Sequence, residues 1–312
     1  MRLVYLPNSV PCFNATEEQV ERFAARVGPS GEVRFCRTEE EFLALLPQAR
    51  AVFVWEFRQE WFARAPLLAH ICTPAAGRDL FKIDPPSGVT LHYGSFHGAI
   101  MAETALGAVL SCAHGLLQFS RAMTDGGELW PRPAIVSGAR RVHGSTIVIL
   151  GFGAIGRRFG ALAKALGATV VGVRRNAVQD PAAADRVIPV ARLDETLPLA
   201  DHLVCFLPSG PETTNMLDAR RISLLKPSAF VYNFGRGNSI DESALAAALD
   251  AGRVAGAVLD VFQREPLPAD SPLRAARNAF LYPHSSAFSP DYLDLYFDAA
   301  AKCIEEEVAK LA

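Results

Sequence analysis

The stretch STIVILGFGAIGRRF, residues 145–159, constrains the fold of this chain more than any other. It joins an apolar run to a helical pattern through Gly151, Gly153 and Gly156, in the spacing G-x-G-x-x-G. After a strand, the first glycine permits a tight turn, the second lets the backbone approach a pyrophosphate, and the third lets helix and strand pack closely. The spacing alone is weak evidence for a dinucleotide site. The alternative interpretation is a glycine-rich turn that binds no ligand. Its context predicts a strand–turn–helix unit that binds a dinucleotide at the helix N-terminus.

Strand-like and helical segments alternate along most of the chain. Before the glycine loop the strand candidates are RLVYLP, EVRFC, AVFVW and AHICT, and after it they are TVVGV, HLVCFL, AFVYNF, GAVLDVF and AFLYPH. Helical patterns such as TEEQVERFAARVG and DESALAAALDAG separate them. Such alternation predicts α/β units on parallel sheets, the second one doubly wound. One long, apolar helical segment is expected between the two sets, over residues 99–123.

Length and composition suit two globular domains. The chain has 312 residues, and its net charge of −2 gives no reason to expect a nucleic-acid or membrane partner. We find neither a signal-peptide pattern nor an uncharged apolar run long enough to span a bilayer. The six cysteines are widely spaced, and the seven histidines lack the spacing of metal ligands. We therefore expect reduced cysteines in a cytoplasmic protein, and no metal site.

The strand after the glycine loop bears on the choice between NAD and NADP. Sites that prefer NAD usually carry Asp or Glu at the end of this strand, to bind the ribose 2′-hydroxyl. Here the strand TVVGV is followed by Arg174, Arg175 and Asn176. Because arginine binds a 2′-phosphate through charge-assisted contacts, NADP is the expected cofactor. NAD is the alternative, if the two arginines are only solvated.

Three candidate catalytic residues follow three later strand candidates. Arg236 follows AFVYNF, Glu265 follows GAVLDVF, and His284 ends AFLYPH. Ligands of a doubly wound sheet bind at the carboxyl ends of its strands, where all three residues are expected. A histidine oriented by a carboxylate, with an arginine to bind an anion, suits proton transfer beside a hydride donor.

These segments resemble the D-isomer-specific 2-hydroxyacid dehydrogenase family. The stretches VHGSTIVILGFGAIG, LPSGPET, NFGRG, LDVFQREPLPADSPL and LYPHSSA stand in the family's order and spacing. The resemblance implies a doubly wound (Rossmann) dinucleotide-binding domain, residues 98–287, inserted into a smaller flavodoxin-like substrate domain, residues 1–97 plus 288–312. It also implies reduction of a small 2-oxo acid, such as glyoxylate or hydroxypyruvate, to the D-2-hydroxy acid by hydride transfer from NADPH or NADH.

The resemblance also implies roles for individual residues. His284 would be the general acid/base, Glu265 its partner, and Arg236 the group that binds the substrate carboxylate and carbonyl. Substrate contacts are expected from Trp55, Ala76 and Gly77, although Trp55 could equally be a core residue. Asp260 would hold the nicotinamide carboxamide. The full set of expected cofactor contacts is Gly151, Phe152, Gly153, Ala154, Ile155, Gly156, Arg174, Arg175, Pro208, Thr213, Phe234, Asp260 and Ser286.

The resemblance leaves some questions open. Ser285 and Ser286 follow His284 where the family usually has an apolar residue and then glycine or alanine. The family includes transcriptional corepressors that keep the same three residues, so a dinucleotide-sensing binding protein is the second hypothesis. The absence of a basic patch favours the enzyme. Family members are commonly dimers through the cofactor domain, so a homodimer is expected, although the apolar segment 102–117 could equally pack inside one chain.

Overall fold

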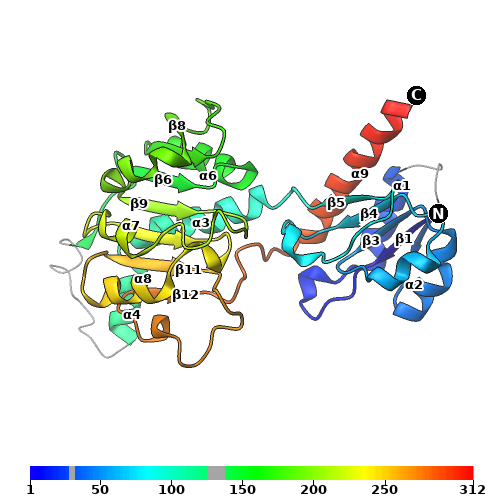
Figure 1. Ribbon diagram of the computed structural model, residues 1–312, viewed down its shortest axis with the longest axis horizontal. Coiled ribbons are helices and arrows are strands. Elements are labelled where there is room, and N and C mark those ends of the chain that lie inside the picture. The colour runs from blue at the N-terminus through cyan, green and yellow to red at the C-terminus, as the bar shows by residue number, and fades with distance from the viewer. Residues whose placement is uncertain (28–31, 125–137, 312) are drawn as a thin grey trace. The chain divides into compact units, whose positions relative to one another are not determined.

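The chain folds into two compact units. The computed structural model describes residues 1–27, 32–124 and 138–311, without the side chains of Leu80 and residues 305–311. Unit 1 comprises Met1–His97 and Phe288–Ala312, and unit 2 comprises Gly98–Ala287 (Figure 1). Each unit is built on one parallel sheet with helices, so the predicted α/β class is confirmed.

Unit 1 contains a five-stranded sheet in the order β2-β1-β3-β4-β5. Helices α1 and α9 pack against each other. Phe53 of β3 contacts Phe23 of α1, whereas the adjacent Val52 packs in the same core as Phe42 of α2. Because successive side chains of a strand point to opposite faces, α1 and α2 cover opposite faces of this sheet. The elements are β1 (Arg2–Tyr5), α1 (Glu17–Val27), β2 (Val33–Phe35), α2 (Glu39–Leu45), β3 (Ala51–Val54), β4 (His70–Thr73), β5 (Thr90–Tyr93) and α9 (Tyr292–Leu311).

Unit 2 contains a seven-stranded sheet in the order β12-β11-β10-β9-β6-β7-β8. From β6 the chain runs outward through β7 and β8, then returns to place β9 on the other side of β6. Ile149 of β6 packs in a core with α3 and α6, whereas its neighbour Leu150 packs in a core with α7 and α8. This is the doubly wound arrangement predicted from the sequence.

The elements of unit 2 follow the sequence pattern with a few additions. In chain order they are α3 (Gly98–Ala113), α4 (Leu116–Thr124), β6 (Thr146–Leu150), α6 (Ala154–Ala165), β7 (Thr169–Arg174), β8 (Arg186–Pro189), β9 (His202–Cys205), α7 (Ala219–Ser223), β10 (Phe230–Asn233), α8 (Glu242–Asp250), β11 (Gly256–Leu259) and β12 (Ala279–Leu281). The six cysteines of the chain all lie in described residues and are free thiols.

The prediction of one long helix over residues 99–123 is wrong. The segment forms two helices, α3 and α4, whose axes are bent by 68°. Gly115 lies between them with a φ of +72°, a conformation that glycine adopts readily and that commonly ends a helix. Among the described helices none is by itself long and apolar enough to span a membrane, and only this bent pair meets both criteria together.

A buried histidine lies in the core of unit 2. His202 is the first residue of β9, and its Nδ1 lies 2.9 Å from the hydroxyl of Tyr232 on the neighbouring strand β10. Burial lowers the pKa of His202 to about 4, although the nearby Asp201 carboxylate opposes the effect. The folded protein therefore keeps this imidazole neutral at pH values where an exposed histidine becomes charged.

Because His202 stays neutral in the folded state, we expect the protein to lose stability as the pH falls from about 6.5 to about 4. In this range the unfolded chain takes up a proton that the folded chain cannot, and the loss reaches about 3 kcal/mol below the folded pKa. Urea unfolding followed by circular dichroism would measure this loss in the wild type and in His202→Gln. The variant should show a shallower pH dependence, whereas His114→Gln, at an exposed position, should match the wild type. Equal pH dependence in all three proteins would contradict the assignment.

Candidate active site

The glycine loop joins β6 to α6 and is shaped to admit a pyrophosphate. At Gly151, where φ is +91°, a Cβ would lie 2.7 Å from the carbonyl carbon of Phe206, and at Gly156 it would lie 2.5 Å from the carbonyl oxygen of Gly151. At Gly153 a Cβ would meet no protein atom within 4 Å, so the backbone is open there. Two tightly packed glycines and one open glycine, directly before Ala154 at the start of α6, fit the requirements of dinucleotide binding.

The loops after β9 and β10 adjoin the glycine loop. A Cβ at Gly235 would lie 2.5 Å from the backbone nitrogen of Leu207, so these two loops touch. Thr213 is buried, and its hydroxyl donates to the carbonyl of Pro208 at 2.8 Å, which shapes the loop after β9. Phe234 is buried and stacks on Phe206.

Two of the expected cofactor contacts can be made only through the backbone. The Phe152 side chain is buried over Gly172, where a Cβ would lie 2.5 Å from the Phe152 ring. The Phe234 ring is likewise enclosed in the core. The rings of both residues therefore hold the loops in place, and only their main-chain atoms are available to a ligand. The motif spacing alone does not distinguish side-chain contacts from main-chain contacts.

Cations stand at the end of β7, where a carboxylate would mark an NAD site. Arg174 is the last residue of the strand and is half-buried, whereas the Arg175 side chain is 81% exposed. The Arg175 Nη1 lies 3.7 Å from a carboxylate oxygen of Glu212, on the loop after β9. The exposed Glu212 carboxylate is thus the acidic group that a 2′-phosphate would have to displace from Arg175.

The structure brings His284 and Glu265 into direct contact. The Nδ1 of His284 lies 2.7 Å from Oε2 of Glu265, and the two side chains are 48% and 36% exposed. The other carboxylate oxygen, Oε1, accepts the backbone N–H of Phe262 at 3.0 Å. One carboxylate oxygen is therefore fixed by the backbone, and the other is directed at the imidazole.

Asp260 holds the backbone on which His284 stands. Its carbonyl accepts the N–H of His284 at 2.8 Å, and its carboxylate accepts the N–H groups of Ser285 at 2.7 Å and of Ser286 at 3.0 Å. Asp260 is 1% exposed, and His284 has a φ of +52°, which a side chain other than glycine rarely adopts. The structure thus gives Asp260 a positioning role in addition to the cofactor contact expected from the resemblance.

Arg236 lies on the loop next to Glu265. A Cβ at Gly237 would lie 1.9 Å from the carbonyl carbon of Phe262, so the loop after β10 packs directly on the loop after β11. The carbonyl of Arg236 accepts the side chains of Asn233 at 3.1 Å and Ser239 at 2.8 Å. Strands β10, β11 and β12 are neighbours in the sheet, so Arg236, Glu265 and His284 all stand at its carboxyl edge.

Three polar residues that hold these loops were not among those predicted from the sequence. Asn233 and Ser239 fix the backbone of Arg236, and the Thr104 hydroxyl of α3 donates to the carbonyl of Ser286 at 2.9 Å. Asn233 is the first residue of the NFGRG motif and Ser239 lies two residues after its end, so the motif is a local signal of a shaped turn. Thr104 lies 182 residues from its partner, and the sequence carries no signal for that contact.

The substrate residues expected in unit 1 follow two of its strands. Trp55 follows β3, is partly exposed, and its indole N–H donates to the carbonyl of Phe13 at 2.8 Å. Its ring is stacked with Tyr292 at 6.0 Å between centroids. Ala76 and Gly77 follow β4 on a loop, where Ala76 is exposed and Gly77 is half-buried.

Two further side chains of unit 1 have structural partners. His97 is buried, and its Nε2 lies 2.8 Å from the hydroxyl of Tyr292. Arg58 donates to both carboxylate oxygens of Glu39, at 2.9 and 3.0 Å, and lies over the ring of Trp61. These contacts favour packing and surface roles for His97 and Arg58 over contact with a substrate.

Comparisons with known proteins agree with the fold and the loop. The family model "D-isomer specific 2-hydroxyacid dehydrogenase, NAD binding domain" matches residues 106–286. A glyoxylate/hydroxypyruvate reductase B from Pectobacterium carotovorum subsp. carotovorum is 31% identical over 261 residues, which cover 81% of this chain and 79% of that protein. A D-isomer specific 2-hydroxyacid dehydrogenase from Xanthobacter autotrophicus Py2, solved with NADPH and MES, has a TM-score of 0.77 at 26% identity, covering 98% of this chain and 95% of that one.

A longer relative also matches. A D-3-phosphoglycerate dehydrogenase from Mycobacterium bovis is 29% identical over 296 residues, which cover 92% of this chain. They cover only 54% of that protein, so the chain spans about half the length of this relative.

The fold and the glycine loop define a protein with a doubly wound, dinucleotide-binding domain. The family model that matches residues 106–286 and the 31% identical relative also establish the family. The chain belongs to the D-isomer-specific 2-hydroxyacid dehydrogenase family, and unit 2 contains the NAD-binding domain of that family.

The contacts of Asp260 predict the effect of a single change. Asp260→Asn would place an amide N–H₂ against a backbone N–H, because each carboxylate oxygen accepts one amide. A buried donor would be left without a partner, so the free energy of unfolding should fall by about 1–3 kcal/mol. Asp250→Asn is the matched control, since Asp250 is exposed and accepts the N–H of Arg277 at 3.0 Å. Chemical unfolding would measure the free energy of unfolding of both variants. An equal decrease for the two variants would contradict the positioning role of Asp260.

Proposed function

We propose that the protein is an NADP-preferring oxidoreductase that reduces a small 2-oxo acid, of the glyoxylate or hydroxypyruvate kind, to the D-2-hydroxy acid. The observation that carries this proposal is the 2.7 Å contact between Nδ1 of His284 and Oε2 of Glu265, at the sheet edge that also carries the glycine loop. An imidazolium held in this way donates Nδ1–H to the carboxylate and keeps Nε2–H for a substrate oxygen.

Each member of the site has one task in this proposal. The glycine loop from Gly151 to Gly156 holds the pyrophosphate of the dinucleotide. When bound, NADPH supplies the hydride that reduces the carbonyl carbon of the oxo acid. His284 gives its proton to the carbonyl oxygen, Glu265 stabilises the imidazolium by charge and hydrogen bond, and Asp260 fixes the loop that carries the ring.

Arg236 binds the acid and polarises the carbonyl. Arg236 is half-buried on a loop that packs against the Glu265 loop, where a carboxylate ligand would be partly shielded from water. The backbone amides of Ala76 and Gly77 are proposed to bind the substrate carboxylate as well, and Trp55 to limit the size of the substrate. The pairing of a planar guanidinium with a carboxylate fixes the acid in one orientation, which is what hydride transfer to one face requires.

The comparisons support this substrate class. The relative named for glyoxylate and hydroxypyruvate is matched over 79% of its length, whereas the one named for D-3-phosphoglycerate is matched over 54%. The first relative is therefore the better guide to the substrate of this chain. The free cysteines are consistent with a cytoplasmic location. The exposed apolar residues Leu116 and Met123 of α4 are consistent with a homodimer formed through unit 2.

The loss of absorbance of the reduced nicotinamide tests the proposed reaction. Purified protein would be mixed with NADPH or NADH and with glyoxylate, hydroxypyruvate, pyruvate or a bulkier 2-oxo acid. We expect turnover with NADPH and a small oxo acid, and a roughly hundredfold lower kcat/KM in Arg236→Gln, which loses the cation that pairs with the acid. Arg253→Gln, at an exposed position before β11, should keep full activity. Dinucleotide binding without turnover of any oxo acid would instead support the dinucleotide-sensing alternative.

Arg174 and Arg175 should set the preference for NADPH over NADH. Replacing both with glutamine removes the cations available to the 2′-phosphate, so the Kd for NADPH should rise about 10- to 100-fold while the Kd for NADH stays the same. Fluorescence titration of the bound dinucleotide would measure both constants without requiring catalysis. An equal rise for NADPH and NADH, or no change for either, would remove the 2′-phosphate role and leave the catalytic proposal intact.

A further inference from the structure

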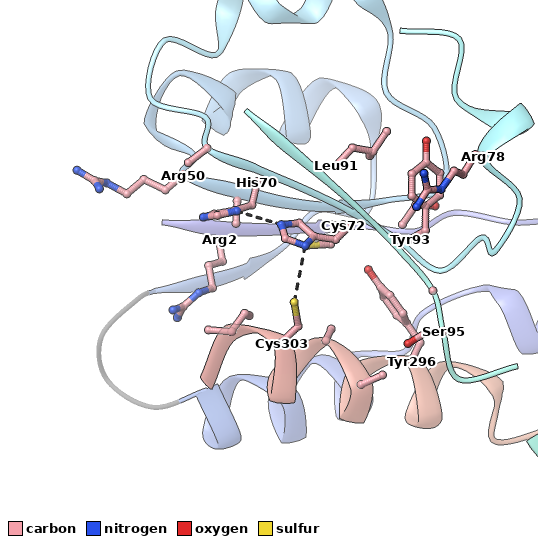
Figure 2. Close-up of a pocket in the computed structure, with 18 of the residues that line it drawn as sticks. Arg2, Arg50, His70, Cys72, Arg78, Leu91, Tyr93, Ser95, Tyr296 and Cys303 are labelled. Atoms are coloured by element: carbon pink, nitrogen blue, oxygen red, sulfur yellow. Dashed lines mark hydrogen bonds between the residues drawn. The ribbon is translucent and has the colours of Figure 1, made fainter. Parts of the chain in front are cut away.

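Unit 1 contains a cavity that the proposed reaction does not use. It has a volume of about 530 Å³ and lies between α9 and the strands β4 and β5 (Figure 2). The paired residues Cys72 and His92 point to the same face of the sheet, and His92 contacts Cys303 of α9. The helix turns the small side chains of Ala299 and Ala300 into the cavity, which leaves the space between helix and sheet open.

One end of the cavity is rich in groups that can carry positive charge. Arg2 is the first residue of β1, Arg50 directly precedes β3, and His70 is the first residue of β4. In a parallel sheet the amino ends of the strands meet at one edge, and all three residues line the cavity there. Among the described side chains that line the cavity, none is Asp or Glu. The side chains of that described lining that can carry charge near neutral pH are therefore basic.

The floor of the cavity is polar and connected. Nδ1 of His70 lies 3.1 Å from Nε2 of His92, and Nδ1 of His92 lies 3.7 Å from Sγ of Cys303 (Figure 2). This chain of contacts leads from the cationic end to the wall formed by α9. At the far end, the guanidinium of Arg78 lies 5.6 Å from the centre of the Tyr93 ring.

Size and lining together indicate the kind of ligand. A volume of about 530 Å³ lies within the usual range for small-molecule sites. The cations suit an oxyanion, and the apolar wall suits a carbon skeleton. The cationic end lies at the amino edge of the sheet, whereas Trp55, Ala76 and Gly77 follow the carboxyl ends of β3 and β4. The cationic end is thus separate from the residues proposed to bind the oxo acid.

We propose that this cavity is a second ligand site, which binds a small organic anion. Its phosphate or carboxylate group is held by Arg2, Arg50 and His70, and its carbon skeleton lies against Ala299 and Ala300 of α9. Because the ligand contacts both the sheet and the helix, its binding also stabilises the packing of α9 on β4 and β5.

The test uses the whole protein, with inorganic phosphate, citrate and fructose 1,6-bisphosphate as probes at one ionic strength. Isothermal titration calorimetry measures binding directly. Alkylation by iodoacetamide, followed by mass spectrometry, reports on the cavity through Cys303, and Cys12 is the internal control, since it is half-exposed and lies outside the cavity lining. We expect at least one organic anion to bind and to slow the alkylation of Cys303 without affecting Cys12.

Variants of the arginines test whether the anion binds at the cationic end of the cavity. Arg2→Gln with Arg50→Gln should weaken the binding of the anion at least tenfold, because charge-assisted contacts are lost. Arg37→Gln is the control, since Arg37 is exposed in the same unit and is paired with Glu17. Binding of citrate alone identifies a carboxylate ligand, binding of the bisphosphate alone identifies a phosphate ligand, and binding of both identifies a site that accepts either oxyanion. Absence of heat with all three probes at millimolar concentration, or equal binding by the double variant and the wild type, would overturn the proposal.

Discussion

The proposed chemistry depends on the hydrogen bonds between the buried Asp260 and the backbone that carries His284. His284 has an unfavourable positive φ, and its side chain is 48% exposed, so packing alone cannot fix the direction of its ring. Asp260 accepts the N–H groups of three consecutive residues, His284, Ser285 and Ser286, and thereby fixes the backbone. With the backbone fixed, the contact with Glu265 orients the imidazole ring of His284. The two serines, which depart from the usual family pattern, serve here through their backbone amides.

The parallel sheet of unit 2 explains why distant parts of the sequence meet at one edge. Its loops after β6, β9, β10, β11 and β12 all leave from the carboxyl ends of strands, and they pack on one another where glycine permits close approach. At Gly237 a side chain would collide with Phe262, so the Arg236 loop can rest directly on the Glu265 loop. The buried residues of these strands are apolar except His202 and Asn233, whereas the proposed catalytic residues lie on the loops.

The fold class could be predicted, and the candidate residues could be proposed, because their signals are local. The glycine spacing, the strand ends and the order of Arg236, Glu265 and His284 are all visible in short stretches. Strands β5 and β8, with the sequences TLHY and RVIP, were missed because polar or charged residues interrupt their short apolar patterns. The contacts of Asp260 depend on the pairing of β11 with β12, and the cavity depends on residues such as His92 and Cys303, which are 211 positions apart. Such long-range contacts leave no local trace in a single sequence.

If His284 supplies the proton in the reduction of a 2-oxo acid, as we propose, its replacement should slow the chemical step. The most direct test is a single-turnover stopped-flow measurement with hydroxypyruvate and saturating NADPH, comparing the wild type, His284→Gln and the exposed control His114→Gln. We expect the rate of NADPH oxidation to fall about 10²- to 10⁴-fold in His284→Gln alone, while the Kd for NADPH stays the same. A His284→Gln protein that oxidises NADPH at the wild-type rate would show that His284 is not the proton donor.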